Sequence, residues 1–156
     1  MRKLIEQWAT AGDPNAMIKL ATIYLEEGKS DDAKKFLVRA AEKNYRPAAV
    51  KLAKIFHEEG NLSEAVTFYK KATELGDVEA MDALVEICAD DEEILDFVLK
   101  NIEKHYNDIS NLDDLRHMLY LGAHIIDAAN YTLSYAEAIE RRRIRNKILQ
   151  LKAKEA

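Results

Sequence analysis

The chain has 156 residues, of which 33% are charged and 48% are hydrophobic, and its formal net charge is −5 at pH 7. This length suits one domain with a buried core. One cysteine excludes an intramolecular disulfide, and no apolar run approaches the ~18 residues of a membrane-spanning helix. The opening residues turn polar before a signal-peptide core forms, so we predict a cytoplasmic protein with no membrane contact. Only two prolines and five glycines interrupt the chain, which favours helices over sheets.

The first predicted element is a short helix over residues 1–11. Its Leu4 and Trp8 fall in the register of Phe68 and Ala72, two periods of 32 residues later. Those residues belong to the second helix of a repeating unit, so we expect residues 1–11 to form a second-type helix that caps the stack.

Residues 12–43 and 44–75 are two copies of this unit. GDPNAMIKLATIYLEEG overlays NYRPAAVKLAKIFHEEG, which pairs Gly28 with Gly60 and aligns the apolar positions on either side. Each copy is predicted to form two short helices joined by a tight glycine turn. A repeat of this length indicates a helical solenoid, a class of protein that mostly binds other molecules along an extended face.

Helix boundaries follow from local signals. Asp13 precedes a proline and predicts the N-cap of a helix over 14–27, which Gly28 ends in a left-handed conformation. Ser30 is expected to cap the following helix. Asn61 is expected to begin the second helix of the next unit with a capping box.

A third unit is predicted over 76–107, where the pattern becomes weaker, and a divergent terminal helix pair over 108–156. The predicted fold is all-α, a right-handed α-solenoid of antiparallel helix pairs within one domain, 1–156. We expect its core to contain Leu20, Ala21, Tyr24, Leu37, Leu52, Ala53, Phe56, Tyr69, Leu84 and Val85.

The glycine turn between paired helices resembles that of tetratricopeptide repeats, and ATELGDVEAMDAL (72–84) resembles the junction of their Sel-like repeat branch. The resemblance covers residues 1–89. It implies stacked helix pairs whose first helices line a concave groove that binds a partner. The corresponding outward positions here are Asn15, Ile18, Thr22, Leu25, Val50, Lys54, His57, Glu79, Asp82 and Glu86.

These outward positions form a mixed surface. The carboxylates of the third unit disfavour an acidic peptide tail, whereas Ile18, Leu25 and Val50 offer apolar anchors for a partner helix or loop. The alternative interpretation is an ordinary solvated face.

Nothing in the sequence indicates catalysis or a cofactor. The four histidines lack chelating spacing, and no zinc, phosphate-loop or nucleophile motif is present. Cys88 replaces an aromatic residue of the repeat and is interpreted as a packed thiol. We therefore predict neither enzymatic activity nor a bound metal.

The C-terminal segment is basic. Residues 140–156 carry a balance of +5, which leaves −10 for the rest of the chain. Ile144 and Ile148 lie on a narrow apolar stripe beside Arg142 and Arg145, which we select as further partner contacts. This helix could cap the stack, pair with a second copy to form a homodimer, or meet phosphates.

The sequence thus predicts a non-catalytic protein–protein interaction module that uses the concave face and the C-terminal helices. Its role would be that of an adaptor, or of an immunity-type protein that neutralises a bacterial toxin. The alternative is a nucleic-acid-binding accessory protein that uses the basic helix, which the acidic body disfavours.

Overall fold

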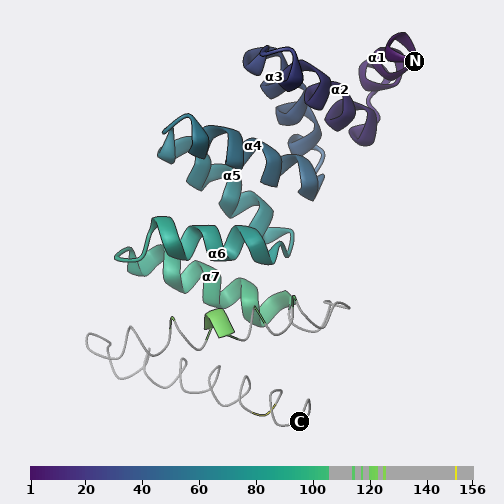
Figure 1. Cartoon of the computed structure of the whole chain (residues 1–156). Helices are drawn as coiled ribbons and strands as arrows, with labels where there is room; N and C mark the ends of the chain where they lie inside the picture. Colours follow the sequence, from purple (N-terminus) through teal and green to yellow (C-terminus); the bar gives the residue numbers. More distant parts are fainter. Residues whose placement is uncertain (106–113, 115–116, 118–119, 123–124, 126–149, 151–156) are drawn as a thin grey trace. The chain divides into compact units, whose positions relative to one another are not determined.

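The computed structural model describes residues 1–105, 114, 117, 120–122, 125 and 150. Within this part of the chain there are seven helices and no strand, so the all-α prediction is confirmed (Figure 1). The chain divides into two compact units, Met1–Ala80 and Met81–Ala156. A single repeat domain over the whole chain stays a prediction.

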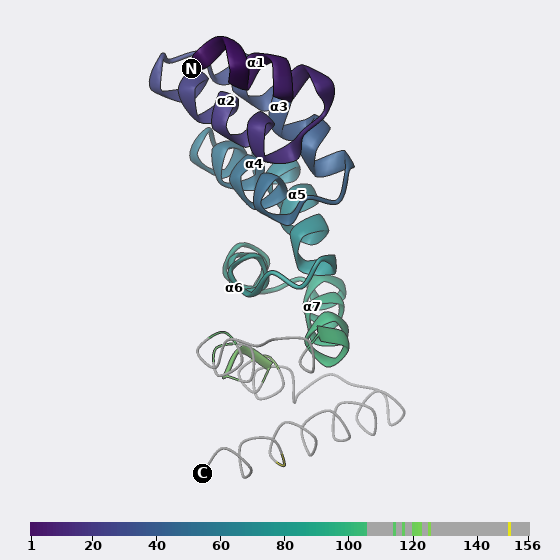
Figure 2. The same cartoon turned by 90° about the vertical axis from the view of Figure 1, so that its right-hand side faces the viewer.

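The first unit is built mainly from antiparallel helices: α1 (Arg2–Ala11), α2 (Pro14–Glu26), α3 (Ser30–Glu42), α4 (Arg46–Glu58) and α5 (Leu62–Glu74). Each of these helices packs on the next one along the chain. Figure 2 shows α2 and α4 in one layer and α3 and α5 in the other. The pairs α2–α3 and α4–α5 are therefore the two copies that the sequence repeat predicts.

Two further helices follow. α6 (Val78–Ile87) begins in the first unit and continues in the second, and α7 (Glu92–His105) belongs to the second. Both fall within the predicted third unit, although their assignment as a repeat stays a prediction. Most of the predicted terminal pair, and nearly all of the basic segment, lies outside the described residues.

The predicted start and end of α2 are confirmed. The Asp13 carboxylate accepts a hydrogen bond from the Ala16 backbone N–H at 2.6 Å, which satisfies one of the unpaired donors of the first turn. Gly28 follows the helix with a φ of 73°, a conformation that residues with a Cβ rarely adopt. Local sequence therefore decides where this helix begins and ends.

The predicted cap of α3 is wrong, and that of α5 is confirmed in position but not in its hydrogen bond. Ser30 is the first residue of α3 and not its cap, and its hydroxyl donates to the Glu59 carboxylate at 2.8 Å. Asn61 occupies the N-cap position of α5 but makes no side-chain cap hydrogen bond. A capping hydroxyl accepts from the backbone N–H groups of the first turn, whereas Ser30 lies inside that turn and donates its proton to a charged carboxylate.

Most of the predicted core is confirmed. The positions that are buried are Leu20, Ala21, Leu37, Leu52, Ala53, Tyr69 and Leu84. Alanine is frequent among buried residues on every helix of the first unit, which lets the helix backbones approach closely.

Tyr24, Phe56 and Val85 are only half-buried, so their assignment to the core is wrong. Tyr24 and Phe56 each stack on a phenylalanine of their own repeat, with ring centroids 5.9 and 5.7 Å apart. Their rings also receive basic side chains from the preceding helix. The Arg2 guanidinium carbon lies 5.6 Å from the centre of the Tyr24 ring, and Lys34 Nζ lies 5.3 Å from that of Phe56.

The same basic residues link successive repeats by ion pairs. Arg2 pairs with Glu27, and Lys34 Nζ donates to Glu59 at 2.7 Å. Lys34 and Glu59 each lie 32 residues after their counterparts Arg2 and Glu27, so the same ion pair occurs twice at the spacing of the repeat. The hydrogen bond from Lys34 holds the pKa of Glu59 below its usual value, and Glu59 raises the pKa of Lys34. Val66 replaces the basic residue one period further on, so this contact joins α1 to α2 and α3 to α4 without extending to a third junction.

Candidate functional site

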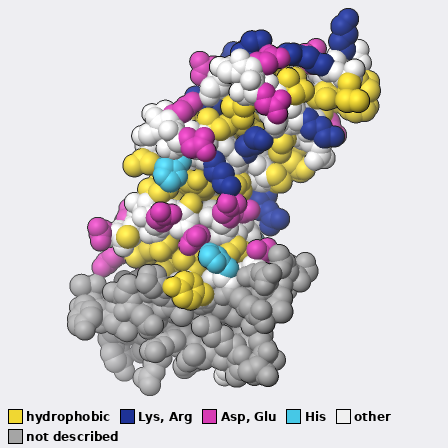
Figure 3. Space-filling view, in the orientation of Figure 1, with side chains coloured by type: hydrophobic (Ala, Val, Ile, Leu, Met, Phe, Trp, Pro, Cys, Tyr) yellow, Lys and Arg dark blue, Asp and Glu magenta, His cyan; other side chains and the backbone are white. Residues whose placement is uncertain are grey.

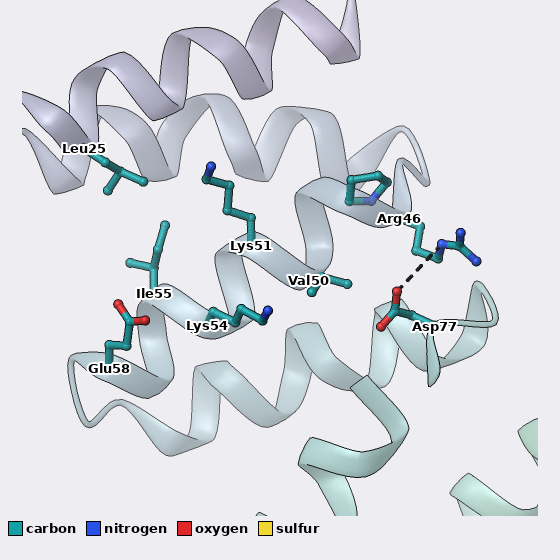
Figure 4. Close-up of a pocket in the computed structure, with 9 residues that line it drawn as sticks. Leu25, Arg46, Val50, Lys51, Lys54, Ile55, Glu58 and Asp77 are labelled. Carbon is teal, nitrogen blue, oxygen red and sulfur yellow. Dashed lines mark ion pairs between the residues drawn. The ribbon is translucent and has the colours of Figure 1, made fainter. Parts of the chain in front are cut away.

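The first unit contains an open pocket between α2 and α4 with a volume of about 580 Å³ (Figure 4). Its lining is supplied mainly by one stripe of α4, whose members are spaced three and four residues apart and so share a helix face. The lining residues are Leu25, Arg46, Pro47, Val50, Lys51, Lys54, Ile55, Glu58 and Asp77.

Three side chains supply most of the apolar lining of the pocket. Leu25 projects from α2, and Val50 and Ile55 project from α4 (Figure 4). Leu25 and Val50 are half-buried, which leaves apolar surface available within the pocket, whereas Ile55 is 8% exposed. A partner side chain that covers the first two would bury apolar surface without displacing the core.

Arg46 and Asp77 close the end of the pocket that faces the start of α6. Arg46 Nε lies 3.8 Å from Asp77 Oδ2, an ion pair marked in Figure 4. Asp77 also accepts a hydrogen bond from the Ala80 backbone N–H at 2.9 Å, which caps α6. Burial raises the pKa of Asp77, and the Ala80 N–H and Arg46 oppose that rise.

The two lysines of the pocket differ in their partners. Lys54 Nζ donates to the Glu79 carboxylate at 2.7 Å, and this hydrogen bond raises the pKa of Lys54. Lys51 Nζ donates to the Thr22 hydroxyl at 2.8 Å, and that neutral group is its partner. The Lys51 ammonium therefore brings a charge to the pocket that no carboxylate offsets by direct contact within the described chain.

The structure brings together some of the partner contacts predicted from sequence. Leu25, Val50 and Lys54 line the pocket, and Thr22 and Glu79 are bonded to its lysines. The other members in the first unit lie outside the lining: Asn15, whose side chain accepts from the Tyr45 hydroxyl; Ile18, which is half-buried; and His57, which is exposed with its ring nearly perpendicular to that of Tyr69.

Asp82 and Glu86 are exposed on the part of α6 that belongs to the second unit, where Asp82 Oδ2 lies 3.5 Å from His117 Nε2. Acidic side chains gather over α6, whereas acidic, basic and hydrophobic side chains mix over α4 (Figure 3). Arg142 and Arg145 lie outside the described residues.

The sequence did not predict most of the pocket lining, and this includes most of its charged residues. The residues that it did not select are Arg46, Pro47, Lys51, Ile55, Glu58 and Asp77. A signal was present on α4, because all of them except Asp77 continue the helical stripe of Val50 and Lys54. Cys88, predicted to be packed on a buried face, is half-exposed.

Within the described part of the chain, no three histidine, cysteine or acidic side chains are arranged to hold a metal ion. Over the same residues, no helix has the length and apolar character needed to cross a bilayer.

Residues 14–42 and 47–75 each match the tetratricopeptide repeat family. These ranges coincide with α2–α3 and α4–α5, the two helix pairs that carry the pocket and the repeated ion pairs. Residues 14–75 therefore form a tandem pair of tetratricopeptide-like helical repeats. The match does not distinguish the Sel-like branch, which stays a prediction, and no curated protein matches the chain.

Tetratricopeptide repeats are generally non-catalytic and mediate protein–protein interactions. The two tandem repeats therefore indicate a protein–protein interaction module, and the pocket marks a candidate contact surface on it.

Proposed function

We propose that this repeat protein is a non-catalytic binding module whose partner protein docks on the face formed by α2 and α4. The pocket between these helices carries the proposal. It combines half-buried apolar side chains with Lys51, whose ammonium is bonded to a neutral hydroxyl. Apolar side chains of the partner would cover Leu25 and Val50, while an oxygen acceptor beside them would receive a hydrogen bond from Lys51.

This arrangement favours a partner segment that presents an apolar anchor next to an acceptor. Arg46 and Lys54 already pair with carboxylates of the chain, which offset most of the positive charge that these two side chains would bring to the pocket. Recognition would therefore depend on shape and one directed hydrogen bond more than on net charge.

The affinity for the partner would distinguish two roles. An adaptor that exchanges partners would bind at micromolar strength, whereas an immunity-type protein would hold one cognate toxin at nanomolar strength or better. Capture of the full chain from its host followed by mass spectrometry supplies the partner, and isothermal titration calorimetry supplies the dissociation constant.

The proposal is tested with Val50→Asp in the pocket and Lys35→Ala as control. Lys35 lies on α3, in the other layer, where it pairs with Asp32. We expect Val50→Asp to weaken binding at least about tenfold, or roughly 1.4 kcal/mol, and Lys35→Ala to leave it nearly unchanged. Equal affinities for both variants, in proteins with unchanged helix content, would move the contact away from this face. Charge reversal at Asp82 and Glu86 then tests whether the α6 surface also takes part.

A further inference from the structure

The helix α1 carries an exposed apolar seam that no other described part of the chain covers. Its members are spaced three and four residues apart along one side of the helix: Met1, Leu4, Trp8 and Ala11. Leu4 is 45% exposed and Trp8 is 53% exposed, which is unusual for side chains of this size. Within the first unit, hydrophobic side chains gather where α1 lies (Figure 3). The adjoining side of α1, which includes the buried Ala9, packs on α2.

The repeat identifies which side of the helix this seam is. α1 packs on α2 through Arg2 in the way that α3 packs on α4 through Lys34, 32 residues later. Leu4 and Trp8 then correspond to Phe36 and Ala40. Phe36 stacks on an aromatic ring of α2, and Ala40 is fully buried. On α3, the side that corresponds to this seam is covered by α2, the first helix of the same repeat. On α1, the corresponding side is exposed.

A further first-type helix would not fit the seam in the same way. Ala40 and Ala72 occupy the position of Trp8 in the two later second helices, and both are 0% exposed. Fully buried alanines mark a close approach of helix backbones, and an indole in that place would force the helices apart. The occupant of the seam must therefore accept a tryptophan.

A second copy of α1 meets this condition. In an antiparallel pair with a two-fold axis near residue 6, Leu4 faces Trp8 of the second copy, and Met1 faces its Ala11. The seam is flanked by Ile5 and the neutral Gln7, so pairing brings no like charges together at its edges.

Arg2 and Lys3 are the cations of α1, and Arg2 is compensated. It pairs with Glu6 and Glu27, and Glu27 also pairs with Lys29, so this cluster of two cations and two carboxylates carries no net charge. We propose that α1 forms a two-fold, antiparallel contact with α1 of a second copy, through Leu4 and Trp8. The seam is small compared with a standard interface, so we expect a dissociation constant between micromolar and millimolar.

Trp8 is the only tryptophan of the chain, so its fluorescence reports directly on this contact. The full-length protein is examined from micromolar to millimolar concentration by tryptophan emission and by sedimentation equilibrium. We expect the emission to shift to the blue as the average mass rises from that of a monomer to that of a dimer, because pairing removes water from the indole.

Leu4→Asp is the test variant, because it removes the seam and keeps the fluorophore. Leu62→Asp is the matched control, since Leu62 is 48% exposed on α5, outside the seam. With helix content checked by circular dichroism, we expect Leu4→Asp to be monomeric with unshifted emission and Leu62→Asp to behave like the unaltered chain. A monomer at millimolar concentration would overturn the proposal. A dimer that survives Leu4→Asp would also overturn it, since the contact would then lie elsewhere, for example on the C-terminal helix.

Discussion

Leu52 is the most direct test of how the repeats are held together. It is 0% exposed on α4, and α4 packs on both α3 and α5. Replacement by alanine removes three carbon atoms from a position that water does not reach. The change therefore probes the packing of the two repeats without altering charge or a helix end.

The expected cost follows from burial. Three buried carbons at about 0.8 kcal/mol each give a transfer cost of roughly 2.4 kcal/mol. The cavity that remains adds to this, because surrounding helices relax only in part, and measured costs for such changes run from about 2 to 5 kcal/mol. We expect Leu52→Ala to lower the free energy of unfolding by about 3 kcal/mol.

Urea unfolding followed by far-ultraviolet circular dichroism measures this loss. Leu62→Ala is the matched control, because Leu62 is 48% exposed, and it should change the free energy of unfolding by less than about 0.5 kcal/mol. If the two units unfold in separate transitions, Leu52→Ala should shift the one that belongs to Met1–Ala80. A cost for Leu52→Ala no larger than that of the control would refute the packing described for α4.

Three further predictions concern the ends and junctions of the repeats. Glu59→Gln removes the ion pair with Lys34 and should lower the free energy of unfolding by about 0.2–1 kcal/mol at neutral pH. The pKa of Glu59 lies below its usual value of 4.5 in the folded protein, so the difference in stability between the variant and the unaltered chain should vanish as the pH falls through the lowered pKa. Urea titrations that show a constant difference into acid would contradict this prediction. Asp13→Ala should cost about 0.5–2 kcal/mol by loss of the cap, whereas Asn61→Ala, which breaks no cap hydrogen bond, should cost less in the same melting experiment. Gly28→Ala should cost about 1–2 kcal/mol, because the backbone φ is 73° although no atom lies within 4 Å of the added Cβ, and an unchanged melting temperature would show that the turn adjusts.

The sequence predicts the repeating framework because its signals are local or strictly periodic. Asp13 caps α2 through a residue three positions later, and Gly28 takes the left-handed conformation that ends it. Leu20 and Leu52 are buried at equivalent points of the period. The helix pairs, their boundaries and most of the core therefore follow from the sequence, as does the likeness of α2–α5 to tetratricopeptide repeats.

The candidate site depends on distances that the sequence does not contain. Thr22 and Lys51 are 29 positions apart, and the hydrogen bond between them exists because α3 holds α2 and α4 at one particular separation. That separation also decides that Arg46 and Asp77 line the same pocket as Leu25. Local signals can identify a helix face, but which side chains meet across two helices is determined by packing, and packing is decided only when all the helices are in place.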